Sequence, residues 1–195
     1  MSGVEGSASA LPVGGSRIPP GRLRQLGPIN WIIAKLAARQ VRAPQMHLFT
    51  TLGYRRLLFW AWAVYGGRLL QGRLPRTDTE LVILRVGHVR SCEYELQHHR
   101  RMARGAGLDD RLQARIFAWP DAVEGDSGEL SDRQRTLLAA TDEIVTTRTI
   151  STATWQHLAA YLDDRQLIEF CLLATQYDGL AATITALRIP LDNPE

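Results

Sequence analysis

Residues 80–107 read ELVILRVGHVRSCEYELQHHRRMARGAG, and this stretch decides the fold class. From Cys92 onward its apolar residues recur every three or four positions, which is the spacing of one face of an α-helix. The pattern stops at Gly107, a residue type that commonly ends helices. We therefore predict a helix from Cys92 to Ala106 with one buried face and one face in water.

Helical spacing recurs along most of the remaining chain. Ser131-Asp-Arg-Gln134 is a capping box, a motif that opens a helix, and Thr77-Asp-Thr-Glu80 has the same form. No segment alternates apolar and polar residues as a strand would, and no glycine-rich phosphate loop is present. The sequence therefore predicts an all-α fold. Further helices are predicted over 31–41 (capped by Asn30), 44–71 (interrupted at Gly53), 109–119, 152–162 and 165–187.

The length of the chain suits one domain. Its 195 residues can bury a sizeable core, and 45% hydrophobic with 22% charged residues is ordinary for a globular protein. Residues 1–20 are rich in Gly, Ser and Pro and have no periodicity. We predict a disordered or loosely packed arm over residues 1–20 and a single helical domain over residues 21–195.

Composition argues against several classes of protein. The formal net charge is only +3, and the arginines are spread along the chain, so no nucleic-acid partner is expected. Two cysteines, Cys92 and Cys171, are too few for a disulfide-stapled secreted fold. The first ten residues lack a signal-peptide pattern, and the longest apolar run, 57–65, is far short of the roughly 20 residues of a membrane span. We expect a cytoplasmic protein with no membrane partner.

One face of the predicted helix 92–106 carries three reactive side chains. At about 100° per residue, Cys92, Glu95 and His99 fall within about 60° of one another. A buried carboxylate needs a proton or a hydrogen-bond donor, and His99 lies one turn beyond Glu95, within reach for a charge-assisted pair. A protonated His99, or the helix N-terminus, would lower the pKa of the Cys92 thiol. Such clustering of titratable groups indicates a functional site.

Each candidate residue also has a purely structural interpretation. A cysteine on an apolar stripe is commonly a small core residue, and a Glu–His pair one turn apart is often only a structural pair. Glu80 would have its role in the capping box that begins at Thr77. Tyr94 and His98 lie at the boundary of the apolar stripe and would only line it. Cys171 stands in the densely apolar stretch LIEFCLL and is interpreted as core.

The spacing of the four candidates resembles a known family. Glu80, Cys92, Glu95 and His99, followed by the segment 103–108, are similar to the carboxymuconolactone decarboxylase and alkylhydroperoxidase D superfamily. A weaker likeness extends the coverage to roughly residues 30–192. It rests on Trp119-Pro120, the helix 137–144, Gln176-Tyr-Asp178 and Ile189-Pro-Leu-Asp192. The resemblance implies a compact helical bundle that assembles into trimers or hexamers, with active sites near subunit contacts.

The chain departs from the peroxidase branch of this family at one position. That branch has a Cys-x-x-Cys pair, a glutamate twelve residues before the first cysteine and a histidine four residues after the second. Glu80, Cys92 and His99 match these positions, whereas Glu95 replaces the second cysteine. A carboxylate cannot form a disulfide, so Cys92 would need an external thiol, or Cys171, to resolve a sulfenic acid. A two-cysteine peroxidase cycle is not expected.

The decarboxylase branch offers a different match. Its helix resembles Glu-Leu-x-x-His, which is read here from Glu95 to His99, and it needs no thiol. That branch stabilises negative charge on a lactone or enolate and moves a proton. The leading hypothesis is therefore acid–base chemistry, a decarboxylation or an isomerisation, on a small organic acid, lactone or carbonyl compound.

The leading hypothesis gives each candidate a role. His99 acts as general acid or base, Glu95 orients it or transfers the proton, and Glu80 is a relay. Cys92 polarises or lines the pocket. The residues expected to bind substrate are Tyr94, His98 and Met102.

Two other functions remain open. The first is a one-cysteine hydroperoxide reductase or thiol sensor, with Cys92 as the reactive group and with His99 and Glu80 lowering its pKa. The second is a non-catalytic oligomeric binding module, in which the apolar helix 57–64 serves mainly as a subunit interface.

The expected partners are a small-molecule substrate and further copies of the chain. His98, His99 and Glu95 do not form a convincing metal-ligand set, because a dedicated site usually draws its ligands from several elements. No metal and no organic cofactor is indicated by the sequence.

Overall fold

The computed structural model describes residues 15–121 and 130–193, and all regular secondary structure within these ranges is helical. The prediction of an all-α fold is therefore confirmed. In chain order the helices are α1 (Leu23–Gln40), α2 (His47–Leu52), α3 (Arg56–Leu70), α4 (Arg76–Val89), α5 (Glu93–Gly105), α6 (Asp110–Ala118), α7 (Asp132–Thr147), α8 (Thr152–Ala159) and α9 (Asp164–Leu187).

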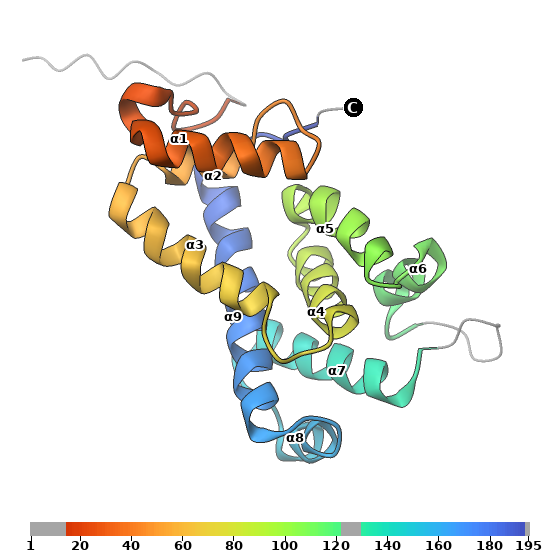
Figure 1. The fold of residues 1–195 in the computed structure, drawn as a ribbon. Coiled ribbons are helices and arrows are strands. Elements are labelled where there is room, and N and C mark those ends of the chain that lie inside the picture. Colours follow the sequence, from red (N-terminus) through yellow and green to blue (C-terminus); the bar gives the residue numbers. More distant parts are fainter. Residues whose placement is uncertain (1–14, 122–129, 194–195) are drawn as a thin grey trace, which may run out of the picture.

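Helix α4 forms the centre of the molecule. Ten consecutive residues, 78–87, are buried, as expected for a helix that is enclosed on all sides. It packs against α5, α6, α7 and α9, while α9 also contacts α3 on its other side. Figure 1 shows the long α9 running between α3 and α4. Side chains of α5, α9 and the N-terminal helices line a cavity.

The close approach of α4 and α5 depends on one small residue. A Cβ atom on Gly87 would lie 3.1 Å from Leu96 Cδ2, so the leucine side chain would have to shift by a few tenths of an ångström to admit it. Glycine permits such an approach because it has no side chain. The packing of α4 against α5 also brings Glu80 beside His99.

The capping box at the start of α7 is confirmed. The Ser131 hydroxyl accepts a hydrogen bond from the Gln134 backbone N–H at 3.2 Å, and the Gln134 side chain accepts one from the Ser131 N–H at 2.8 Å. Asp163 caps α9 in the same reciprocal way with Gln166. The Ser131 motif could be recognised from the sequence because this helix end is exposed to water, whereas the Asp163 cap was not predicted.

The predicted capping box over Thr77–Glu80 is wrong. Helix α4 begins at Arg76 with Pro75 as its N-cap, and no side chain caps it. The Thr77 hydroxyl instead donates to the Ala106 carbonyl at 2.9 Å. The Glu80 side chain is buried and forms tertiary contacts, which take precedence over the local motif.

The predicted start of the first helix is also wrong. Helix α1 begins at Leu23 and bends at Gly27, which has a φ of 77°, before Pro28 opens its second part. A Gly-Pro pair is typical of a helix end, and here the non-helical Gly27 separates two helical segments that meet at a kink. Asn30 lies buried inside α1, where its amide donates to the Gly53 carbonyl at 3.4 Å rather than acting as a cap.

The N-terminal arm is described only in part. Residues 15–20 have no regular secondary structure, and Arg17 ties them to the end of α9 through its N–H to Leu187 and its guanidinium to Ala186. The rest of the predicted arm lies outside the described residues. The division into an arm and one domain therefore stays a prediction.

Most of the exposed large apolar side chains in the described residues lie on three helices. They lie on α1, α3 and α9, and include Ile29, Ile32, Leu36, Leu57, Leu58, Trp60, Val64, Ile168 and Leu172. None of the helices within residues 15–121 and 130–193 combines the length and apolar character needed to cross a membrane.

Candidate active site

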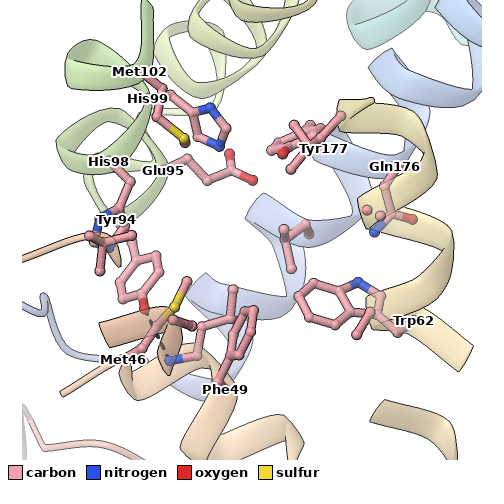
Figure 2. Close-up of a pocket in the computed structure, with 18 of the residues that line it drawn as sticks. Met46, Phe49, Trp62, Tyr94, Glu95, His98, His99, Met102, Gln176 and Tyr177 are labelled. Carbon is pink, nitrogen blue, oxygen red and sulfur yellow. Dashed lines mark hydrogen bonds between the residues drawn. The ribbon is translucent and has the colours of Figure 1, made fainter. Parts of the chain in front are cut away.

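A cavity of about 640 Å³ lies between α5, α9 and the N-terminal helices α1–α3. Its volume is that of a site for a small organic molecule. Most of its lining is apolar, with a few polar groups from α5 and α9 (Figure 2). The apolar lining includes Ile33, Leu36, Phe49, Trp62, Leu70 and Leu180.

The cavity brings together most of the residues selected from the sequence. Glu95, His99, Tyr94, His98 and Met102 all line it. The two remaining candidates, at positions 80 and 92, are not among the lining residues. Glu80 contacts His99 and Cys92 lies beside Glu95, so both lie behind residues that do line the cavity.

His99 is held by Glu80 and not by Glu95. Its Nδ1 lies 2.8 Å from Glu80 Oε2, and Arg76 forms an ion pair with the other Glu80 oxygen at 2.5 Å. The predicted pair between Glu95 and His99 is therefore wrong. That prediction considered only neighbours on the same helix, whereas the packing of α4 against α5 places another carboxylate beside the imidazole.

This contact assigns the tautomer of His99. Because Glu80 is paired with Arg76, it acts as an acceptor toward the imidazole, and Nδ1 carries the donated proton. In the neutral form of the ring, Nε2 then keeps its lone pair. Figure 2 shows the edge of the ring directed at the cavity next to Glu95. His99 is thus arranged as a proton acceptor toward any ligand in the cavity.

Glu95 is a buried carboxyl group without a hydrogen-bonded partner in the described parts of the chain. Its side chain projects into the cavity (Figure 2), and the residue is only 3% exposed. Burial raises its pKa to about 8. The adjacent Cys92 thiol partly opposes this rise, although the contact lacks hydrogen-bond geometry. At neutral pH Glu95 is therefore mostly a neutral acid that can donate a proton.

Cys92 is a poor candidate for a reactive thiolate. It is the N-cap of α5 and 3% exposed, and burial together with the Glu95 charge raises its pKa to about 12. The prediction of a lowered thiol pKa is therefore wrong. Backbone N–H groups of the first turn do favour the thiolate, but the loss of water around the sulfur outweighs them.

Tyr94 and His98 share a buried partner, Asp192, which follows α9. The Tyr94 hydroxyl donates to Asp192 Oδ2 at 2.6 Å, and His98 Nε2 lies 2.9 Å from the same oxygen. His47 contacts Oδ1 through its backbone N–H at 2.7 Å and its Nδ1 at 2.8 Å. Burial alone would raise the Asp192 pKa, but these hydrogen bonds lower it. The Tyr94 hydroxyl and Nε2 of His98 are therefore already occupied by Asp192.

Tyr177 is a site residue that the sequence analysis did not select. It lies on α9, lines the cavity and packs edge-to-face on His99, with ring centroids 5.2 Å apart at 87°. Burial and the nearby carboxyl groups of Glu95 and Glu80 raise its pKa well above 10. In the sequence it appeared only within Gln176-Tyr-Asp178, a stretch that resembles the family. Its role in the site could not be predicted, because nothing in the local sequence indicates that α9 brings this ring against His99 of α5.

The described residues include no group of three or more His, Cys, Asp or Glu side chains arranged to hold a metal ion. Besides Gln176 and Arg101, which also line the cavity, its polar groups lie in two separate clusters. One contains His99, Glu80 and Glu95, and the other surrounds Asp192.

Residues 56–143 match the model of the carboxymuconolactone decarboxylase family. This range runs from α3 into α7 and contains every candidate from Glu80 to His99. No relative was found among curated protein sequences.

Several solved structures share the whole fold. A peroxidase-related protein from Ralstonia eutropha JMP134, with an alkylhydroperoxidase AhpD core, superposes with a TM-score of 0.77 at 15% identity over 91% of this chain and 93% of its own. A peroxidase-related protein from Silicibacter sp. TM1040 gives 0.74 at 14% identity over 93% and 94%. The debrominase Bmp8, as a cysteine-to-alanine variant in complex with 2,3,4-tribromopyrrole, gives 0.72 at 13% identity over 88% and 90%.

Proposed function

Since residues 56–143 match the model of the carboxymuconolactone decarboxylase family and the fold is similar to that of a protein with an alkylhydroperoxidase AhpD core, we propose that the cavity carries out non-redox acid–base chemistry. The reaction is a decarboxylation or an isomerisation of a small organic acid, lactone or carbonyl compound. One observation carries the proposal: a free imidazole nitrogen and a neutral carboxylic acid face the same largely apolar cavity.

In this mechanism His99 moves the proton. Its Nε2 takes a proton from a carbon next to a carbonyl group and returns it in the second step. Glu80 holds the imidazole through Nδ1 and stabilises the positive charge that forms on it, while Arg76 fixes Glu80. Glu95 donates a hydrogen bond to the oxygen on which negative charge develops. Cys92 stays a neutral thiol beside Glu95.

The cavity supports small, mostly apolar substrates. Its lining offers few polar groups, so a highly charged or strongly hydrated molecule would lose more hydration than the site replaces. The structurally similar debrominase binds 2,3,4-tribromopyrrole, a small planar ring. By analogy, ring compounds such as lactones and cyclic ketones are the first class to test.

The proposal can be tested without knowing the natural substrate. Lactones and cyclic ketones are incubated with the protein in D₂O, and exchange of the protons next to the carbonyl is followed by mass spectrometry. We expect His99→Ala to slow exchange by roughly 10²–10⁴-fold, which is the usual contribution of a general base. Glu95→Gln should slow it less, because the amide still donates a hydrogen bond. Cys92→Ser should retain exchange within a few-fold.

The opposite ranking would reject this mechanism. If Cys92→Ser alone abolished turnover while the His99 and Glu95 variants stayed fully active, the thiol and not the imidazole would be the reacting group. The proposal would also be rejected for this substrate class if the unmodified protein catalysed proton exchange in none of the carbonyl compounds.

A one-cysteine hydroperoxide reductase or thiol sensor is the second candidate. Two of the structurally similar proteins are peroxidase-related, which favours it. The thiolate of Cys92 would attack the peroxide O–O bond to give a sulfenic acid and an alcohol, and two external thiols would restore it while forming a disulfide and water. The high thiol pKa and the burial of Cys92 weigh against this reaction.

Intact-mass measurement after mild peroxide treatment separates the two candidates. A rapid oxygen adduct on Cys92 that dithiol reverses would favour the reductase, and an inert Cys92 would favour the acid–base enzyme. The third candidate, a non-catalytic binding module, is weakened by a cavity that reaches Glu95 and His99.

A further inference from the structure

We propose that Glu95 and Tyr177 together form a two-donor pocket that binds a single negatively charged oxygen, such as that of an enolate or a phenolate. The inference rests on the proposed function and deepens it, because it names the substrate class: planar carbonyl compounds whose enolate places its oxygen between the carboxyl and hydroxyl groups. Neither the sequence pattern nor the family likeness assigns this role to Tyr177.

The first support is the geometry. Glu95 comes from α5 and Tyr177 from α9, and both side chains line the same cavity. Figure 2 shows the Tyr177 hydroxyl directed toward the Glu95 carboxyl group, with His99 beside both. Neither oxygen of the Glu95 carboxyl group has a hydrogen-bond partner within the described residues, although both are buried. A buried polar group without a partner is costly, and this one is aimed at space that a ligand can occupy.

The second support is the protonation state. The pKa of Glu95, about 8, leaves it mostly neutral at pH 7, and the pKa of Tyr177 is raised well above 10, mainly by burial. Both groups therefore present an O–H donor, and neither brings a negative charge that would repel an anion. A neutral carboxylic acid paired with a phenol is a known way to stabilise an enolate oxygen in an apolar site.

The third support is the position of the base. His99 packs against the Tyr177 ring, so a carbonyl oxygen held by Tyr177 and Glu95 brings the adjacent carbon close to the imidazole. The step is balanced: the C–H bond breaks, its proton goes to Nε2 of His99, and its electron pair forms C=C as the carbonyl oxygen becomes anionic. Reprotonation at another carbon completes an isomerisation without any co-reactant.

Phenols test the donor pair directly, because a phenolate is a stable, planar mimic of an enolate. 4-Nitrophenol is suitable, since its absorbance reports whether it is bound as the anion. We expect it to bind as the phenolate, with Tyr177→Phe weakening binding on the order of 10–100-fold, as for loss of a hydrogen bond to a charged group. Glu95→Ala should have a similar effect, and Glu95→Gln should restore most of the affinity.

Tyr161→Phe is the matched comparison. It removes a hydroxyl from a tyrosine that is 40% exposed and does not line the cavity, so phenolate affinity should change by less than about threefold. Thermal unfolding of each variant checks that the fold is retained. The inference is overturned if 4-nitrophenol does not bind, if it binds as the neutral phenol, or if Tyr177→Phe binds it as tightly as the unmodified protein.

His99→Ala separates this inference from the proposed function. It should retain phenolate binding, because the donors are intact, while losing proton exchange. Phenolate binding without exchange in the unmodified protein would reject the proposed reaction and keep the anion site. The anion site alone would be rejected if Tyr177→Phe changed neither proton exchange nor phenolate binding while exchange still required His99.

Discussion

Cys92 and Glu95 illustrate how burial sets the chemistry of individual side chains. Both lie at the start of α5, where backbone N–H groups favour negative charge, yet both have raised pKa values. The cost of removing a charged form from water exceeds the contribution of the helix end at these positions. The result is a neutral acid and a neutral thiol side by side.

The raised pKa of Glu95 predicts a pH dependence of stability. Between its ordinary value of 4.5 and about 8, the folded protein holds a proton that the unfolded chain has released. The contribution of Glu95 to the free energy of unfolding is therefore fully present below pH 4.5 and is lost as the pH rises toward 8. Glu95→Gln should abolish this contribution. Between pH 5 and pH 8 the variant should therefore lose roughly 2–4 kcal/mol less of its free energy of unfolding than the unmodified protein loses.

Urea unfolding at pH 5 and pH 8 measures this difference. The lowered pKa of Asp192 affects stability only at more acidic pH, so it does not interfere. Equal pH dependence in the two proteins would show that Glu95 is ionised in the folded state, and the acid–base mechanism would lose its neutral donor.

The raised pKa of Cys92 predicts an unreactive thiol. Alkylating agents attack the thiolate, and a pKa of about 12 leaves about 10³-fold less thiolate at pH 8 than an ordinary cysteine has. In a Cys171→Ser background, iodoacetamide should modify Cys92 slower than the urea-unfolded chain by about this factor, as followed by intact mass. Equal rates would indicate an accessible thiolate and favour the hydroperoxide reductase.

Sequence alone placed Cys92, Glu95 and His99 on one buried face, because helical periodicity is a local property of the chain. It could not show that His99 pairs with Glu80, since that contact depends on how α4 packs against α5. Tyr177 was missed for the same reason, as α9 comes much later in the chain. Burial, and with it the sign of the pKa shift at Cys92, is likewise a tertiary property.

At the level of elements, the segment after α9 is held in place by Asp192. Its carboxyl group is buried and connects that segment to α2 through His47, and to α5 through Tyr94 and His98. Two of these three partners line the cavity. The C-terminal segment therefore supports one wall of the site.

Asp192→Asn should destabilise the protein markedly. The amide cannot accept all the hydrogen bonds that the carboxylate accepts, so buried donors lose their partner, at a cost of roughly 2–4 kcal/mol. Asp110→Asn is a suitable control, because Asp110 forms an exposed ion pair with Arg104 and should contribute less than about 1 kcal/mol. Urea unfolding of both variants measures these losses in the free energy of unfolding. Similar values for both variants would mean that Asp192 does not anchor the segment.

Helix ends could be predicted where the signal was local and the end exposed. Ser131 behaves as its motif indicates, because nothing else competes for its hydroxyl. Thr77 and Glu80 have the same pattern, but both make tertiary contacts and the motif does not form. Helix α1 has a short first segment before the kink at Gly27 and Pro28, which the sequence analysis did not predict.

For the whole molecule, the exposed apolar surface is the main feature that the single chain leaves unexplained. Leu57 is 86% exposed and Leu58 63% on α3, and Ile168 is 62% exposed on α9. Extended apolar surface of this kind commonly marks an interface. It supports the proposal, made from the family likeness, that the chain assembles into trimers or hexamers.

We predict that size-exclusion chromatography with light scattering at about 50 µM will show an oligomer. Leu57→Arg should shift the mass toward that of a single chain, because it places a charge within the buried contact. Arg104→Glu, which lies on the water-facing side of α5, should leave the mass unchanged. A monomeric unmodified protein at this concentration would contradict the proposal.

The neutral carboxyl group of Glu95 also gives the cavity an intrinsic spectroscopic label. A protonated acid has an infrared carbonyl stretch that is separate from the bands of the peptide backbone and of ionised carboxylates, and its frequency responds to hydrogen bonding. Difference spectra between Glu95→Gln and the unmodified protein would isolate that single vibration. Any molecule that enters the cavity and accepts a hydrogen bond from the Glu95 carboxyl group would then shift the band. Ligands can therefore be screened before a reaction is known.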